Sequence, residues 1–200
     1  MSEPTIYKPS VYNARTIYNT GSGGGVVTND YIIVQPIDGV EMPDGRVWST
    51  RNLILSPYGI QQGENWQLTP AELCAYNNNP ANIDYGLYYN YEAVLYIHNK
   101  KSILIPGWDI PTMAEWRALL NSVGNDYNTL QNTGFNDIKT GQMSPGTGNW
   151  GGLTSYSFYW SRTGASGDFA YSAFISPSLI DAESQQWKQS MQSIRLIKDL

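Results

Sequence analysis

GWDIPTMAEW, at residues 107–116, carries the clearest structural signal in the chain. Thr112 is suited to cap a helix, and Glu115 can reach back to it from three residues later, which makes a capping box. Apolar side chains then recur at helical spacing, and Gly124 supplies the left-handed residue with which many helices end. The apolar positions are Met113, Trp116, Leu119, Leu120 and Val123. The pattern predicts a helix that begins after Thr112, ends before Gly124 and buries one face.

Two other helices are predicted upstream. A second capping box, Thr69 with Glu72, predicts a helix that ends near residues 77–80 and holds Cys74 as a small buried side chain in its middle. Residues 85–98 are apolar and aromatic, with a spacing closer to that of a helix than of a strand. His98 would then lie at a helix end, where a cation complements the dipole.

Strand signals flank these helices. Residues 31–34 have strand character, and the Asp44-Gly45 turn predicts a hairpin around it. Beyond residue 134, short aromatic runs such as residues 156–160 alternate with Gly, Asn, Ser and Thr, and residues 193–197 are a plausible closing strand. Together the patterns predict an α+β domain in which a few helices pack against a small, irregular antiparallel sheet joined by long loops.

Length and composition narrow the function classes. The chain has 200 residues, enough for one domain with a short appendage, and 13% aromatic residues argue against disorder. A net charge of −5 with scattered Lys and Arg makes nucleic acid an unsuitable partner. One Cys and one His rule out a disulfide within the chain and the usual multi-Cys or His-rich metal sites. We therefore expect no cofactor and no metal.

The first 28 residues differ from the rest. A β-branched residue followed by Tyr recurs three times, Pro4 and Pro9 favour extended backbone, and a Gly-rich linker follows at residues 21–25. The three pairs are Ile6 with Tyr7, Val11 with Tyr12, and Ile17 with Tyr18. One interpretation is a disordered tail, and the other is a peptide arm that docks these pairs on a partner. We expect residues 1–28 to form an anchoring arm and residues 29–200 to form the domain.

Motifs for catalysis are incomplete. The glycines at residues 21–25 do not continue as a phosphate loop, residues 164–168 lack the last glycine of a nucleophile elbow, and Asp126 opens a calcium-loop pattern that is not completed. A structural role is expected for His98. The carboxylates that could form an acid–base pair have no spacing that requires one, and they are Asp168, Asp181 and Glu183. The residues therefore favour a protein that is not an enzyme.

Aromatic side chains are the best candidates for a ligand surface, because flat apolar rings with polar edges bind sugars and proteins. Most of the tryptophans are expected to be core residues. The ligand candidates are aromatic residues expected in loops of the Gly-rich region, and they are Trp150, Tyr156, Phe169 and Tyr171.

Five segments, in order, resemble the Fibrobacter succinogenes major paralogous domain. Its motifs are G-x-x-W-x-x-x-N-L, G-x-L-Y-x-W-x-x-A, G-W-x-L-P-T-x-x-E-W, Y-W-S-S-T and S-V-R. The matching segments are residues 44–53 (DGRVWSTRNL), 85–93 (YGLYYNYEA), 107–116 (GWDIPTMAEW), 159–163 (YWSRT) and 193–195 (SIR). The resemblance covers about residues 40–198.

The resemblance implies a C-type lectin-like fold, related to the formylglycine-generating sulfatase-modifying domain. In that fold the first and last strands pair, two helices flank the sheet, and long loops form a variable face. Its motifs are mainly architectural, with Trp116 in a helix and Trp160 packed on the sheet. The Glu-Pro-Asn and Trp-Asn-Asp triplets of calcium lectins are absent, and Cys74 alone cannot supply the paired catalytic cysteines of the formylglycine-generating relatives.

The resemblance and the arm together favour a bacteriophage virion protein, a head or tail fibre or decoration without enzymatic activity. Residues 1–28 would bind other virion proteins, and the lectin-like domain would contact a glycan or protein on the host surface. We expect no export signal and no membrane span, synthesis in the host cytoplasm, and a homo-oligomer, either dimer or trimer. The alternatives are a bacterial surface adhesin or carbohydrate-binding module and, less favoured, an enzyme of the formylglycine-generating type.

Overall fold

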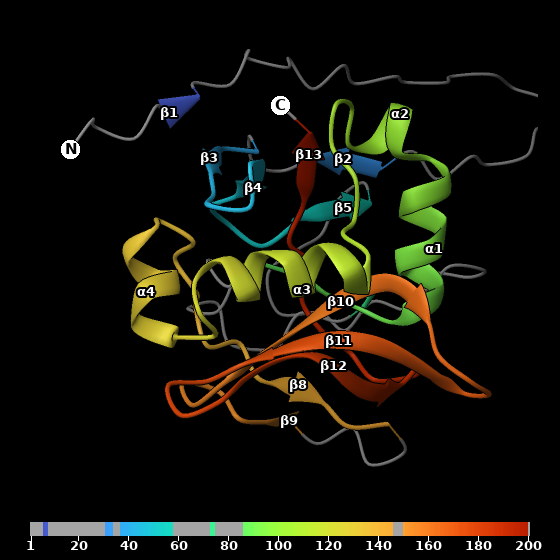
Figure 1. Cartoon of the computed structure of the whole chain (residues 1–200). Coiled ribbons are helices and arrows are strands. Elements are labelled where there is room, and N and C mark those ends of the chain that lie inside the picture. The colour runs from blue at the N-terminus through green and yellow to red at the C-terminus, as the bar shows by residue number, and fades with distance from the viewer. Residues whose placement is uncertain are drawn as a thin grey trace, which may run out of the picture.

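The computed structural model describes residues 6–7, 31–33, 37–57, 73–74, 86–145 and 150–199 (Figure 1). The helices are α1 (Tyr91–Asn99), α2 (Lys101–Leu104), α3 (Met113–Ser122) and α4 (Tyr127–Asn132). The strands in the first half are β1 (Ile6–Tyr7), β2 (Tyr31–Ile33), β3 (Gly39–Glu41), β4 (Arg46–Ser49), β5 (Leu55–Pro57), β6 (Leu73–Cys74) and β7 (Tyr88–Tyr89). The others are β8 (Gln142–Met143), β9 (Trp150–Gly151), β10 (Ser157–Gly164), β11 (Phe169–Ile175), β12 (Ile180–Trp187) and β13 (Ile197–Asp199). The predicted α+β class is confirmed.

The three longest strands form one antiparallel sheet in the order β10–β11–β12, and α3 runs across it in Figure 1. Side chains alternate between the two faces of a strand, so neighbouring residues of β10 point in opposite directions. Tyr159 stacks on Trp116 of α3 with ring centroids 5.7 Å apart, and Trp160 meets Tyr91 of α1 edge-on at 5.6 Å. The two helices therefore cover opposite faces of β10, and Trp116 and Trp160 have the architectural roles expected for them.

A second sheet, in the order β1–β3–β4–β13, brings the two ends of the domain together. The predicted hairpin is confirmed as β3–β4, and Gly45 occupies its turn at φ +77°, a conformation that glycine adopts without strain. The last strand, β13, pairs antiparallel with β4. The predicted closing strand begins later than expected, at Ile197, because Ser193 and Ile194 bond to different neighbours, Phe158 and Leu53.

The first pair of the N-terminal arm is extended, as predicted. Ile6 and Tyr7 form β1 and pair antiparallel with Val40 and Gly39 of β3. The other arm residues, Val11, Tyr12, Ile17 and Tyr18, lie outside the described part of the chain.

The helix expected over residues 85–98 is confirmed only from Tyr91. Tyr88 and Tyr89 instead form β7, which pairs with Leu73 and Cys74 of β6. The prediction of a helix around Cys74 is therefore wrong, because Leu73 and Cys74 form the strand β6. Thr69, the predicted cap of that helix, lies outside the described residues. Tertiary partners explain the change: both tyrosine side chains are fully buried, and the Tyr89 backbone exchanges hydrogen bonds with Gln192, about a hundred residues later.

The helix predicted from GWDIPTMAEW is confirmed in detail. The Thr112 hydroxyl accepts from the Glu115 backbone N–H at 3.2 Å, and Glu115 accepts from the Thr112 N–H at 2.6 Å. At the other end Gly124 has φ +66°, and the Gly124 and Asn125 N–H groups donate to the carbonyls of Asn121 and Leu120, which is a Schellman motif. Both ends of this helix could be predicted from the sequence because each depends on hydrogen bonds between residues close together in the chain.

Arg195 is completely buried at the centre of the domain. Its guanidinium donates to the carbonyls of Ser49, Phe135 and Asn136 at 2.7–3.0 Å. It also lies over the rings of Phe135 and Tyr159, at 4.6 and 5.5 Å from their centroids. One side chain thus links the β3–β4 hairpin region, the loop after α4, and β10.

Candidate functional site

An aromatic surface lies at one end of the β11–β12 ladder. Phe169 pairs across the strands with Trp187, and Tyr171 pairs with Gln185, so all four share one face of the sheet. The Phe169 and Trp187 rings are 4.4 Å apart between centroids. We call these four residues the sheet platform.

The platform is the uncovered end of a face that is buried elsewhere. Further along β11, Ala173 and Ile175 alternate onto the same face and are fully buried in the cluster that contains Trp116 of α3. At the platform, Trp187 is 46% exposed, Gln185 is exposed, and Phe169 and Tyr171 are half-buried. Large rings held on a sheet with part of their surface open can bind a flat apolar ligand face, and the amide and hydroxyl groups beside them can bond its edge.

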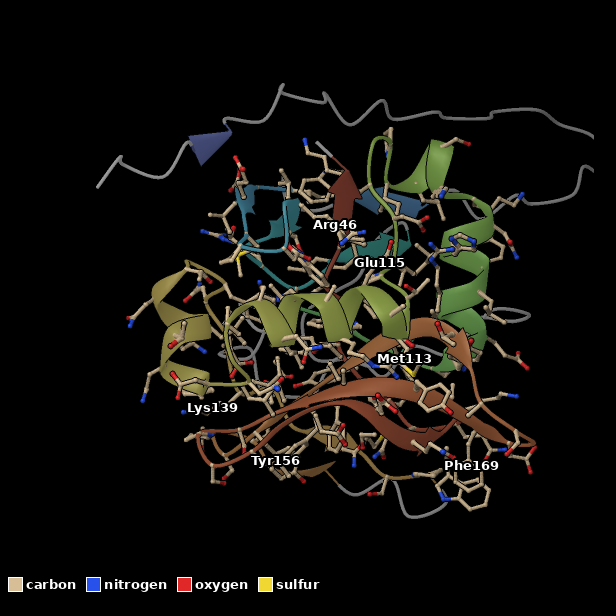
Figure 2. All side chains as sticks on the ribbon, viewed as in Figure 1. Arg46, Met113, Glu115, Lys139, Tyr156 and Phe169 are labelled. Carbon is tan, nitrogen blue, oxygen red and sulfur yellow. The ribbon has the colours of Figure 1, made fainter. Side chains whose placement is uncertain are left out.

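Tyr156 belongs to a separate aromatic cluster on the other face. It packs on Phe158 and Phe174 with centroids 5.6 and 5.4 Å away, and Phe174 alternates to the face opposite Tyr171. A Cβ at Gly152 would overlap the Tyr156 ring, so a glycine is required beneath it. Figure 2 shows Tyr156 and Phe169 toward opposite ends of the sheet.

The four ligand candidates named from the sequence are therefore not one surface. Phe169 and Tyr171 lie together on the platform, Tyr156 lies apart, and the Trp150 side chain lies outside the described residues. Phe169 and Tyr171 are also in a strand rather than in a loop. Sequence reasoning missed Trp187 and Gln185. The sequence of β12, IDAESQQW, places polar residues on both faces, so it has no hydrophobic alternation that would have indicated which face Gln185 and Trp187 share.

A cleft of about 560 Å³ lies on another part of the surface. It opens between α2, the loop before α3, the start of α3, the end of β10, and β13. Its lining includes three cations, two carboxylates and one large ring, which are Lys101, Arg162, Lys198, Asp109, Glu115 and Trp108. We call it the ionic cleft.

Asp109 is the most highly connected group of the cleft. Its Oδ1 accepts from the Nδ1–H of His98 at 2.6 Å and from the Ile110 N–H at 2.7 Å, and its Oδ2 accepts from the Lys101 ammonium. Burial raises the pKa of Asp109, but the hydrogen bonds from Lys101, His98 and Ile110 and the charge of Arg162 outweigh it and hold the pKa below its ordinary value. Asp109 is therefore ionised at neutral pH.

Three other sequence candidates for chemistry have structural partners. His98 lies in the last turn of α1, as expected, and joins that turn to Asp109. Asp126 caps α4 through the Thr129 N–H, and Glu183 pairs with Arg117 of α3. Within the described ranges no group of three or more His, Cys, Asp or Glu side chains is arranged to hold a metal ion. None of the described helices is long and apolar enough to cross a membrane.

Comparison with known families identifies the family to which this chain belongs. Residues 44–198 match the Fibrobacter succinogenes major domain, so the chain belongs to the Fibrobacter succinogenes major domain family. The match includes α1 to α4, β10 to β12 and most of β13, and therefore both the platform and the ionic cleft. No curated protein and no solved structure matches the chain.

Proposed function

We propose that this protein is a recognition protein without enzymatic activity, and that the sheet platform binds a glycan on a cell surface. The Phe169–Trp187 pair carries the proposal, because Trp187 is exposed and cross-strand pairing holds the two rings together. Rings in this position can stack on the apolar face of a sugar, and Gln185 and Tyr171 can hydrogen-bond its hydroxyl groups. Stacking plus edge hydrogen bonds is a geometry that binds without chemical change.

We further propose that the domain has a C-type lectin-like arrangement and that a bacteriophage particle carries it. Pairing of β4 with β13, and α3 and α1 on opposite sides of β10, support the lectin-like arrangement. The particle assignment is supported by the three Ile/Val-Tyr pairs and the Gly-rich linker ahead of the family domain. In this proposal residues 1–28 anchor the protein to other virion proteins, and several copies of the weakly binding domain act together.

The binding proposal is tested by Trp187→Ala. Loss of the exposed ring should weaken binding to the best ligand of a glycan array at least about tenfold, which is the effect of removing a central aromatic contact. Leu179→Ala is the matched control, because Leu179 is 57% exposed at the opposite end of the β11–β12 ladder. Binding that is unchanged in Trp187→Ala, or that falls equally in both variants, would show that the platform is not the glycan site.

The particle assignment has its own test. Antibodies against the domain should label purified phage particles in electron micrographs, and the protein should appear in the protein content of those particles. Labelling of uninfected bacterial cells instead would identify a bacterial surface adhesin and contradict the particle assignment. The glycan-binding proposal would not be affected.

A further inference from the structure

The guanidinium of Arg162 lies in the ionic cleft and is held by a hydrogen bond at its Nε end. The Nε–H of Arg162 donates to the Ile110 carbonyl at 2.8 Å, which sets the plane of the group. Its Nη2 lies 3.8 Å from Asp109 and 4.0 Å from Glu115, too far for a hydrogen bond. Within the described part of the chain, Nη1 donates to no partner, and 28% of the side chain is exposed.

The two carboxylates of the cleft accept their hydrogen bonds from donors other than Arg162. Asp109 accepts from His98, Lys101 and the Ile110 N–H. Glu115 accepts from the N–H and the hydroxyl of Thr112 at 2.6 and 2.9 Å in the capping box. Each carboxylate keeps a long ion-pair contact with Arg162 but makes no hydrogen bond to it, and Arg162 lines the cleft.

The charge and shape of the cleft favour an anion. Three cations and two carboxylates line it, so it is locally positive in a chain of net charge −5. Trp108 forms an apolar wall, and the Lys198 ammonium lies 5.0 Å from the centroid of its ring. Arg162 also stands at the position where the Y-W-S-S-T motif has Ser, so the guanidinium is not part of that motif.

We propose that the ionic cleft binds the oxyanion group of a small ligand, a carboxylate, sulfate or phosphate, with Arg162 as the principal donor. The planar fork of a guanidinium matches two oxygens of such a group, and the field of the lining cations adds to the attraction. The Trp108 wall accommodates the apolar body to which the group is attached. This site is independent of the sheet platform and does not rest on the glycan proposal.

The test titrates the full chain with sulfate, phosphate, glucuronate and uncharged glucose at constant ionic strength, and follows the indole N–H signals by NMR. Constant ionic strength removes general screening from the comparison. At least one of the three anions should saturate a signal of Trp108 and glucose should not, and the preferred anion identifies the source of the oxyanion. Arg162→Gln should weaken that binding at least about tenfold, the effect of losing a charged hydrogen-bond donor.

Two further variants make the result decisive. Lys198→Gln removes a second cation of the lining and should weaken binding by about threefold, which keeps the test valid if Arg162→Gln does not fold. Lys139→Gln is the matched charge control, because Lys139 lies near Tyr127, away from Glu115 of the cleft (Figure 2). The proposal is overturned if no anion saturates, if glucose binds equally well, or if Lys139→Gln weakens binding as much as the cleft variants do.

Discussion

Arg195 connects three separate parts of the folded domain. Its charge is buried, and it is stabilised by three backbone carbonyls and two ring faces. Close by, Asp137 accepts from the hydroxyls of Ser157 and Tyr159 at 2.7 and 2.6 Å. Burial and the Asp137 charge raise the pKa of Tyr159, so this hydroxyl remains protonated and keeps donating to the carboxylate.

Replacing Arg195 should therefore be severe. Arg195→Met fills similar space but leaves two buried carbonyls and one partly buried carbonyl without this donor. At about 1–3 kcal/mol for each buried group, the free energy of unfolding should fall by more than about 2 kcal/mol. Arg195→Lys restores one donor and should be less destabilising. Urea unfolding followed by circular dichroism measures both variants. A loss below 1 kcal/mol for Arg195→Met would contradict the central role.

Asp109 should make stability depend on acid pH. Its folded-state pKa is lowered, so its contribution is fully present above its unfolded pKa, near 3.8, and is lost as pH falls through the lower folded value. Asp109→Asn keeps the shape but removes the charge that His98 and Lys101 bond. It should lower the free energy of unfolding by about 1–3 kcal/mol at pH 7.

The difference between the wild type and Asp109→Asn should then shrink as pH is lowered from about 5 to about 3. Chemical unfolding over this pH series measures it. A difference that stays constant would show that packing, rather than ionisation of Asp109, is what the substitution changes.

At the scale of the element, α3 is specified at both ends by local hydrogen bonds. Its capping box and Schellman motif satisfy backbone groups that the helix itself leaves unpaired. The middle of α3 is specified by packing, since the Trp116 ring centroid lies 4.6 Å from that of Trp48 and 5.7 Å from that of Tyr159. The ends of α3 can therefore be tested without disturbing the core.

Gly124→Ala should destabilise the domain by about 1–2 kcal/mol, because alanine is strained at φ +66° even though the space around Gly124 is open. Thr112→Ala removes the cap and should cost about 1 kcal/mol. Thermal unfolding by calorimetry measures both. Ala118→Gly, in the middle of α3 and half-buried, is a control for helix propensity and should cost about 1 kcal/mol without changing either end.

At the scale of the whole molecule, the two ends of the family domain meet. Residues 46–48 pair with residues 197–199, and the Ser49 carbonyl accepts from the buried Arg195. The domain therefore closes only when its last residues are present. The arm makes a smaller described contribution, the two-residue pairing of β1 with β3.

Truncations should separate these contributions. Removal of residues 193–200 should abolish cooperative unfolding, because it deletes both β13 and Arg195. Removal of residues 1–28 should shift the unfolding midpoint by no more than about 3 °C, the equivalent of roughly 1 kcal/mol, and should abolish incorporation into particles. Calorimetry and particle purification measure the two effects. A shortened protein that still joins particles would contradict the proposed anchoring role of the arm.

The sequence predicted those features that local chemistry determines. The Thr112–Glu115 capping box, the Asp44-Gly45 hairpin and the five family motifs each depend on residues close together in the chain. Prediction failed where a distant partner decided the backbone: Leu73 and Cys74 are a strand because β7 lies beside them, and β7 in turn bonds to Gln192.

The candidate sites divide in the same way. The sequence by itself determined the α+β class and the family, and it named Phe169 and Tyr171 as aromatic candidates for the proposed recognition surface. Only the tertiary structure paired Phe169 with Trp187, moved Tyr156 to another cluster, and gathered Asp109, Arg162 and Lys198 around one cleft. The physical reason is that strand register and helix packing are set by burial of the whole core, which local sequence patterns do not encode.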